Sequence, residues 1–180
     1  AVAWCSHDHV WCLVSYLAMV STPTLLSTLV QLMSVWSDSV EIDQGRYRYL
    51  LCLAWTLSSA LGQLSGDQLA SVRDSLQLRL MSGMGGWLEA DPAKRQLGMI
   101  VATVMLERLD SPLPEWTLGD TESMTVMRSL ASPGRKVDLV KYEISFETWS
   151  AGITATNKSE IVVRKLEKKI EEKSVRNDLD

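Results

Sequence analysis

Two histidines and two nearby cysteines at the start of the chain have the side chains best suited to binding a metal ion. His7 and His9 flank Asp8, and Cys5 and Cys12 lie on either side of this trio. Imidazole and thiolate groups are common zinc ligands in proteins. On a helix, however, residues two positions apart diverge by about 200 degrees, since there are 3.6 residues per turn. The spacing therefore predicts a polar cap at a helix start, and no metal is expected.

A glycine-rich run and the many serines are the other candidates for chemistry. Gly83, Gly85 and Gly86 do not have the spacing of a phosphate-binding loop, follow no strand pattern and are not followed by Lys-Ser or Lys-Thr. No serine has the G-x-S-x-G setting that holds a nucleophile, and both histidines lie near the start of the chain. We therefore expect no enzyme activity and no cofactor. Flexibility or close helix packing explains the glycines better.

The composition limits the class of protein. The chain has 180 residues, enough for a core without disulfides, and its three cysteines are odd in number, which predicts free thiols in a reducing compartment. The net charge of −4 gives no basic face for nucleic acid, so direct binding is disfavoured. The apolar run from Val10 to Val20 is shorter than the roughly 20 residues that a membrane-spanning helix needs. No transmembrane segment is predicted.

Apolar side chains recur at helical spacing through residues 1–110, with short intervals between the runs. Five helices are predicted, with apolar stripes over Val10–Leu17, Leu25–Trp36, Tyr47–Leu64, Leu69–Trp87 and the segment after Asp91. Short connections make consecutive helices antiparallel. Apolar residues on more than one face favour an all-α, HEAT-like solenoid fragment, with a five-helix globule as the alternative.

The segment from Asp91 to Arg108 is the most apolar of the five. Asp91 is a suitable N-cap and Pro92 suits the first helical position. The following residues are apolar on nearly all sides, so this helix must be covered on two sides. A buried strand over Leu97–Leu106 is the alternative because of its β-branched residues, but the length and the Asp-Pro start favour a helix.

Glycine and basic residues within this segment carry further expectations. Gly98 lies inside the predicted helix, where glycine costs roughly 1 kcal/mol relative to alanine. We therefore expect a neighbouring helix to approach it closely. Lys94, Arg95 and Arg108 flank the apolar stretch. They are either its solvated ends or part of a protein-binding ridge.

The character of the chain changes after Leu109. Prolines at 112 and 114 break the helix and begin a flexible linker over residues 111–157, with disorder expected from Thr117 to Arg135. Alternating apolar residues near 138–148 predict an isolated strand, either locally extended or added to a partner's sheet. Residues 158–176 predict a charged amphipathic helix.

The run Arg95-Gln96-Leu97-Gly98-Met99-Ile100-Val101-Ala102 resembles a signature of the telomere length regulation (Tel-two) family. Weaker similarity extends back to about Leu26, so that the resemblance covers roughly the first three fifths of the chain. It implies an α-solenoid scaffold without catalysis. It makes Lys94, Arg95 and Leu97–Ala102 a structural motif that could also contact a partner.

The resemblance also implies partners. In that family the scaffold joins two other helical-repeat proteins in the Triple T complex, a co-chaperone for phosphatidylinositol-3-kinase-related kinases. These kinases act in telomere maintenance, DNA-damage and growth signalling, and are handed to a heat-shock chaperone and its adaptor complex. The implied location is cytoplasmic, with a nuclear or telomeric pool.

The end of the chain has a second, shorter resemblance. Residues 177–180, with Asp178, Leu179 and Asp180, are similar to the leading edge of the acidic linker motif that is phosphorylated in the family and recruits the chaperone adaptor. The serines of that motif are absent here, and residues 137–176 depart from the family's linker. The start at Ala1 and the end at Asp180 predict a fragment of a larger protein.

Two functions from other classes are alternatives. A membrane-surface or lipid-binding helical module would use the apolar N-terminal helices and the Lys-rich segment near the end of the chain. An enzymatic site centred on His7 and His9 comes third.

Overall fold

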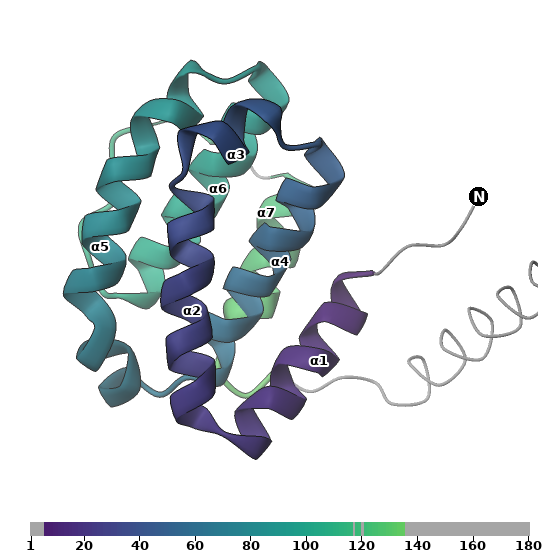
Figure 1. The fold of residues 1–180 in the computed structure, drawn as a ribbon, viewed down its shortest axis with the longest axis vertical. Coiled ribbons are helices and arrows are strands. Elements are labelled where there is room, and N and C mark those ends of the chain that lie inside the picture. Colours follow the sequence, from purple (N-terminus) through teal and green to yellow (C-terminus); the bar gives the residue numbers. More distant parts are fainter. Residues whose placement is uncertain (1–5, 117, 120, 136–180) are drawn as a thin grey trace, which may run out of the picture. The chain divides into compact units, whose positions relative to one another are not determined.

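Seven α-helices make up the part of the chain that the structure, a computed structural model, describes: residues 6–116, 118–119 and 121–135 (Figure 1). They are α1 (His7–Val20), α2 (Thr22–Trp36), α3 (Ser39–Gln44), α4 (Tyr47–Gln63), α5 (Gly66–Glu89), α6 (Pro92–Arg108) and α7 (Glu122–Ala131). No strand occurs among these residues. The predicted all-α class is confirmed.

Side chains immediately before the helices explain where most of them begin. Ser6 and Ser65 cap α1 and α5 in reciprocal pairs with the residues three positions later. The Oδ1 atom of Asp91 accepts hydrogen bonds from the amides of Ala93 and Lys94, both at 3.1 Å. This N-cap and Pro92 start α6 as the sequence predicts, and the same residues are not a strand.

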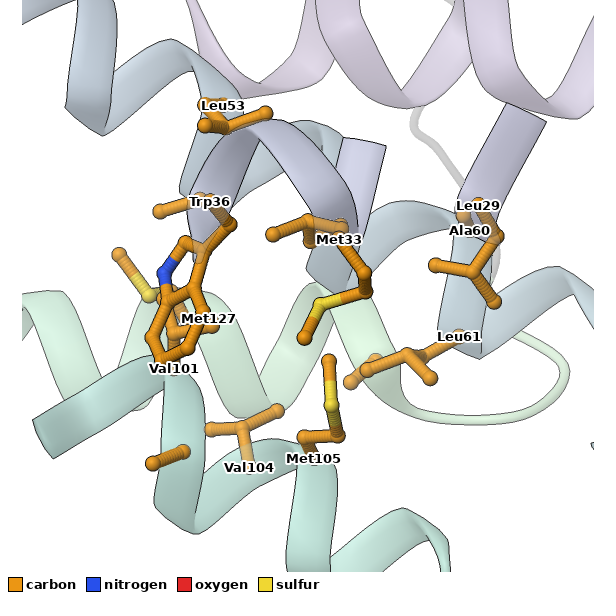
Figure 2. Packing of buried hydrophobic residues seen from close by; sticks show 14 of the residues in the cluster. Leu29, Met33, Trp36, Leu53, Ala60, Leu61, Val101, Val104, Met105 and Met127 are labelled. Carbon is orange, nitrogen blue, oxygen red and sulfur yellow. The ribbon is translucent and has the colours of Figure 1, made fainter. Parts of the chain in front are cut away.

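Helices α4 and α6 lie at the centre of the packing. Helix α4 contacts α1, α2, α6 and α7, and α6 contacts α4, α5 and α7. Eight residues of α6 are buried, among them Val101, Val104 and Met105, which belong to the same hydrophobic core as Met33 of α2 (Figure 2). The prediction that α6 is covered on more than one side is confirmed.

Helices that are two or three places apart in the chain also pack together. Helix α1 contacts α4, α2 contacts α5, and α4 contacts both α6 and α7. In a solenoid each helical pair stacks on the next pair. The arrangement is therefore consistent with a HEAT-like solenoid fragment.

Helix α7 corrects the expectation of disorder from Thr117 to Arg135. Thr121 caps it, and Met124, Met127 and Leu130 are at most 3% exposed. These side chains are three positions apart and so share one face, which packs against α4 and α6. The helix is only 10 residues long, too short to be stable alone. Its stability therefore depends on packing against α4 and α6, and the residues near α7 in the sequence do not indicate that these helices are its neighbours.

Helix α3 was also not predicted. Asp38 Oδ1 caps it by accepting from the amides of Val40 and Glu41 at 2.8 and 3.4 Å. The helix has only 6 residues, and Ile42 is its one buried side chain. Such a short segment gives little periodicity. The predicted strand near 138–148, the helix at 158–176 and the motif edge at 177–180 lie outside the described residues.

Candidate functional site

The family-motif residues lie mostly in the core. Within α6, Leu97, Ile100, Val101 and Ala102 are at most 2% exposed, and Gly98 is buried with them. Met99 and Lys94 are half-buried, whereas Arg95 and Gln96 are exposed. Of the family-motif residues, only those in the first turn of α6 and Met99 are therefore accessible to a partner.

Gly98 lies against an aromatic pair contributed by two other helices. A Cβ atom at this position would lie 2.6 Å from Cγ and Cδ2 of Trp87 in α5. Trp87 stacks on Trp36 of α2 at a centroid distance of 5.2 Å and 28° between planes. Its indole Nε1 donates to the backbone oxygen of Trp36 at 2.9 Å. The expected close approach of a neighbouring helix at Gly98 is confirmed.

Lys94 closes the C-terminal end of α3. Its Nζ atom donates to the backbone oxygens of Ile42 at 2.9 Å and Asp43 at 2.7 Å. The last carbonyl groups of a helix lack partners within the helix and carry partial negative charge. Asp91 Oδ2 lies 3.9 Å from the same Nζ. Lys94 is thus a positioning cation that joins α6 to α3.

Arg108 has the same role at the other end of α6. Its Nη2 atom donates to the backbone oxygens of Leu61 and Leu64, both at 3.0 Å, at the C-terminal end of α4. Burial lowers the pKa of Arg108 below its ordinary value. Arg95, by contrast, is exposed, and its Nη2 donates to the oxygen of Ala90 at 3.2 Å. Of the three basic residues, Arg95 is the most accessible to a partner.

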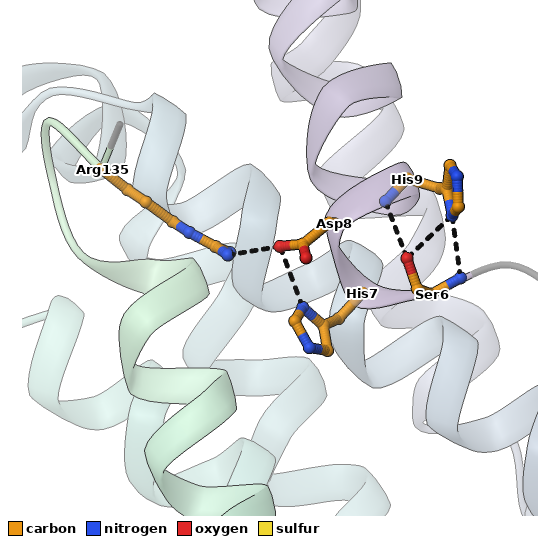
Figure 3. A network of polar contacts seen from close by, with 5 residues as sticks. All are labelled: Ser6, His7, Asp8, His9 and Arg135. Carbon is orange, nitrogen blue, oxygen red and sulfur yellow. Dashed lines mark hydrogen bonds and ion pairs between the residues drawn. The ribbon is translucent and has the colours of Figure 1, made fainter. Parts of the chain in front are cut away.

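The histidine segment forms a cap and an ion pair, shown in Figure 3. Ser6 Oγ lies 2.7 Å from Nδ1 of His9 and accepts from the His9 amide at 3.4 Å. Asp8 Oδ1 accepts from Nη2 of Arg135 at 2.7 Å and lies 3.2 Å from Nδ1 of His7. The predicted polar cap is confirmed. The Asp8 pair also fastens the segment after α7 to α1, which the sequence did not indicate.

The thiols and carboxylates give no further site within the described residues. Cys12 and Cys52 are free and half-buried. Burial raises the pKa of the Cys12 thiol, the charge of Asp8 raises it further, and Arg135 opposes both. No three metal-capable side chains converge within residues 6–116, 118–119 and 121–135. None of the helices in that part of the chain has both the length and the apolar composition needed to cross a bilayer.

The accessible apolar side chains lie on other helices than the family motif. On α1, Leu13 and Tyr16 are each 68% exposed and Met19 is 86% exposed; on α5, Leu78 and Met81 are 72% and 73% exposed. Leu13 belongs to the predicted apolar stripe of the first helix together with Val10 and Val14, so its exposure corrects that part of the prediction. The sequence predicts apolar residues on more than one face, but it does not indicate which of those faces stay exposed.

Comparison with known proteins gives three relatives, all telomere length regulation protein TEL2 homologues. The chain is 30% identical to that of Mus musculus over 126 residues, which are 67% of the chain and 15% of the relative. It is 26% identical to that of Xenopus tropicalis over 117 residues, which are 63% of the chain and 14% of the relative. It is 31% identical to that of Xenopus laevis over 91 residues, which are 50% of the chain and 11% of the relative.

These relatives are named for the regulation of telomere length and not for a reaction. The chain spans 11% to 15% of the length of the relatives that it matches. No protein-family model and no solved structure matches the chain.

Proposed function

This chain belongs to the family of the TEL2 homologues, the telomere length regulation proteins, and we propose that it is part of a non-enzymatic co-chaperone scaffold. The scaffold supports the assembly and stability of phosphatidylinositol-3-kinase-related kinases. Its partners are the other Triple T subunits and a heat-shock chaperone with its adaptor complex. It acts in the cytoplasm, with a nuclear or telomeric pool.

The observation that carries this proposal is the similarity to TEL2 homologues over 67% of the chain. The helical packing supports a scaffold, because stacked helices offer extended faces to other proteins. Most of the family motif is buried and holds α6 against α4, α5 and α7. Partner contacts then belong to exposed faces elsewhere and to the first turn of α6.

Affinity purification of the tagged chain from a cell extract, followed by mass spectrometry, tests the proposal. We expect recovery of the other Triple T subunits or of a phosphatidylinositol-3-kinase-related kinase. Recovery of neither by a chain that circular dichroism shows to be helical would contradict the proposal for this part of the protein.

Two neighbouring residues of α6 provide the controls. Leu97→Asp places a charge in the core, where Leu97 is 1% exposed, so this variant should unfold and lose every partner. Gln96→Asp introduces the same residue at the adjacent, exposed position and should retain the fold and the partners. Equal recovery by both variants would identify the captured proteins as nonspecific.

The first turn of α6 can be tested as a partner surface with Arg95→Glu. Lys94 is unsuitable for this purpose, because its ammonium group holds the carbonyl groups at the end of α3. Reduced recovery of one partner by Arg95→Glu, with an unchanged melting temperature, would place that partner at the start of α6. Unchanged recovery of every partner would show that this turn is not part of a binding surface.

A membrane-surface helical module is a second candidate function, and the exposed apolar residues of α1 favour it. Leu13, Tyr16 and Met19 could enter the interfacial region of a bilayer. No lysine or arginine occurs between Val10 and Ser37, however, so α1 and α2 offer nothing to anionic headgroups. Flotation with anionic vesicles would support this function if the chain rose with the lipid, and would discard it if the chain stayed below.

A further inference from the structure

The outward face of α5 carries a regular stripe of exposed residues, which we name the outer seam: Leu78, Met81, Gly85 and Leu88. Leu78, Met81 and Leu88 are 72%, 73% and 44% exposed, and Gly85 is exposed as well. Intervals of three and four residues place all four on one side of the helix. This is the spacing of a helix that packs against another helix along a heptad seam.

Gly66, at the first position of α5, and Gly85 both have open space beside them, and Gly85 is the one that lies in the interior of the helix. A Cβ atom at Gly83 would lie 2.7 Å from Cα of Ser37, and one at Gly86 would lie 3.1 Å from Cδ1 of Ile42. A Cβ atom at Gly85 would meet nothing within 4 Å. Glycine is unfavourable in a helix interior, and no described residue offsets that cost here. At the centre of an apolar stripe, a glycine allows a second backbone to approach closely.

The charges at the two ends of the outer seam are acidic. Asp74 lies one turn before Leu78, and Glu89 directly follows Leu88. Both are exposed, and neither forms an ion pair with another described residue. Arg73 and Arg79 of the same helix are half-buried. A complementary surface is therefore apolar along its centre and basic at its edges.

We propose that the outer seam binds an amphipathic helix of a partner protein, with apolar residues at heptad spacing and lysine or arginine beside them. Close approach at Gly85 sets the position of the partner helix along the seam. The inference rests on the proposed function, since it locates one of the partner surfaces of the scaffold. In Figure 1, α5 lies at the edge of the array formed by the described helices.

The exposed residues of α1 provide a matched control for this proposal. Leu13 and Met19 are 68% and 86% exposed, and α1 has no acidic residue beside them between Val10 and Val20. The pair Leu13 and Met19 has the same composition as the pair Leu78 and Met81. Replacing either pair with two lysines changes the net charge of the chain by the same amount.

The test uses the full chain and two synthetic helical peptides, each about three heptads long. Both have leucine at the a and d positions; one has lysine at e and g, and the other has glutamate there. Fluorescence anisotropy measures binding. We expect the lysine peptide to bind roughly tenfold or more tightly than the glutamate peptide. Leu78→Lys with Met81→Lys should abolish binding of the lysine peptide, whereas Leu13→Lys with Met19→Lys should leave it unchanged.

Gly85→Ala separates binding from folding. Because nothing surrounds Gly85, alanine should stabilise α5 and raise the melting temperature by roughly 2–4 °C. The same substitution should weaken binding of the lysine peptide several-fold, because the added methyl group keeps the two helices apart. A stabilised chain with unchanged affinity would refute the close approach at Gly85.

Three other outcomes would overturn the proposal. These are equal binding of both peptides, equal losses from the two lysine pairs, and a dimer in sedimentation that Leu78→Lys with Met81→Lys dissociates. The last result would identify a second copy of the chain as the occupant. The peptide test uses no cellular partner, so its failure leaves the co-chaperone proposal standing. Failure of the affinity purification, in turn, does not alter the peptide result.

Discussion

The buried motif of α6 and the outward face of α5 are both apolar and both contain a glycine, yet they have opposite surroundings. Gly98 lies against Trp87, whereas Gly85 has nothing within 4 Å. Leu97 is 1% exposed and Leu78 is 72% exposed. The residues that the sequence analysis identifies as a family motif lie mostly in the buried region, so they mainly hold the helices together. Most of the surface available to a partner lies elsewhere.

Substitution of Trp87 should cause the greatest loss of stability. Trp87 is fully buried, stacks on Trp36 and fills the space beside Gly98. Trp87→Ala should lower the free energy of unfolding by about 3–5 kcal/mol in urea. The next residue, Leu88, lies on the outward face of α5. Leu88→Ala should lower the free energy of unfolding by less than about 1 kcal/mol. Similar losses from both variants would contradict the assignment of the two faces.

A pair of methionines tests burial in α7 against exposure in α5. Met127 is fully buried and Met81 is 73% exposed. Met127→Ala should destabilise the chain by about 2–5 kcal/mol, because it leaves a cavity between α7 and its neighbours. Met81→Ala should change stability by less than about 0.5 kcal/mol. A neutral Met127→Ala would mean that α7 does not belong to the core.

The two glycines should respond to alanine with opposite signs. Gly98→Ala places a methyl group against the Trp87 ring, so we expect a loss of about 1–3 kcal/mol in the free energy of unfolding. Gly85→Ala should instead add up to about 1 kcal/mol. Urea denaturation of the two variants side by side measures both values. Stabilisation by Gly98→Ala would show that the contact is not tight.

The smallest effect is expected at the first turn of α6. Lys94→Met removes the ammonium group that holds the end of α3 and should cost about 1–2 kcal/mol. Arg95→Met, at the exposed neighbouring position, should cost less than about 0.5 kcal/mol. Thermal unfolding of the two variants checks the difference. If Arg95→Met were the more damaging change, Lys94 would not be the positioning cation.

Much of the candidate site could be predicted because its signals are local. The cap at Asp91 with Pro92, and the polar cap formed by Ser6 and His9, involve residues at most three positions apart. The same holds for the expectation of close packing at Gly98, which follows from the cost of glycine in a helix. The identity of its neighbour could not be predicted, because Trp87 and Trp36 come from separate helices.

The missed elements and contacts have physical reasons. Helix α3 has 6 residues, too few for a clear periodic pattern. Helix α7 has 10 residues with apolar side chains at helical spacing, but a helix of that length is stable only when packed against others, and its neighbours come from distant parts of the sequence. The contacts of Lys94 with Asp43 and of Arg135 with Asp8 span 51 and 127 residues of sequence. Separations of that size carry no local signal.

Local patterns along the chain are enough to predict the all-α class, the positions of α1, α2, α4, α5 and α6, and the need to cover α6 on more than one side. Capping residues and apolar periodicity act within a few residues, and so they are readable along the chain. The folded state of α7, the contacts of Lys94 and Arg108 with the ends of other helices, and the exposure of the outer seam become visible only in the packed structure. These features depend on which surfaces meet when the helices pack, and a one-dimensional pattern does not contain that information.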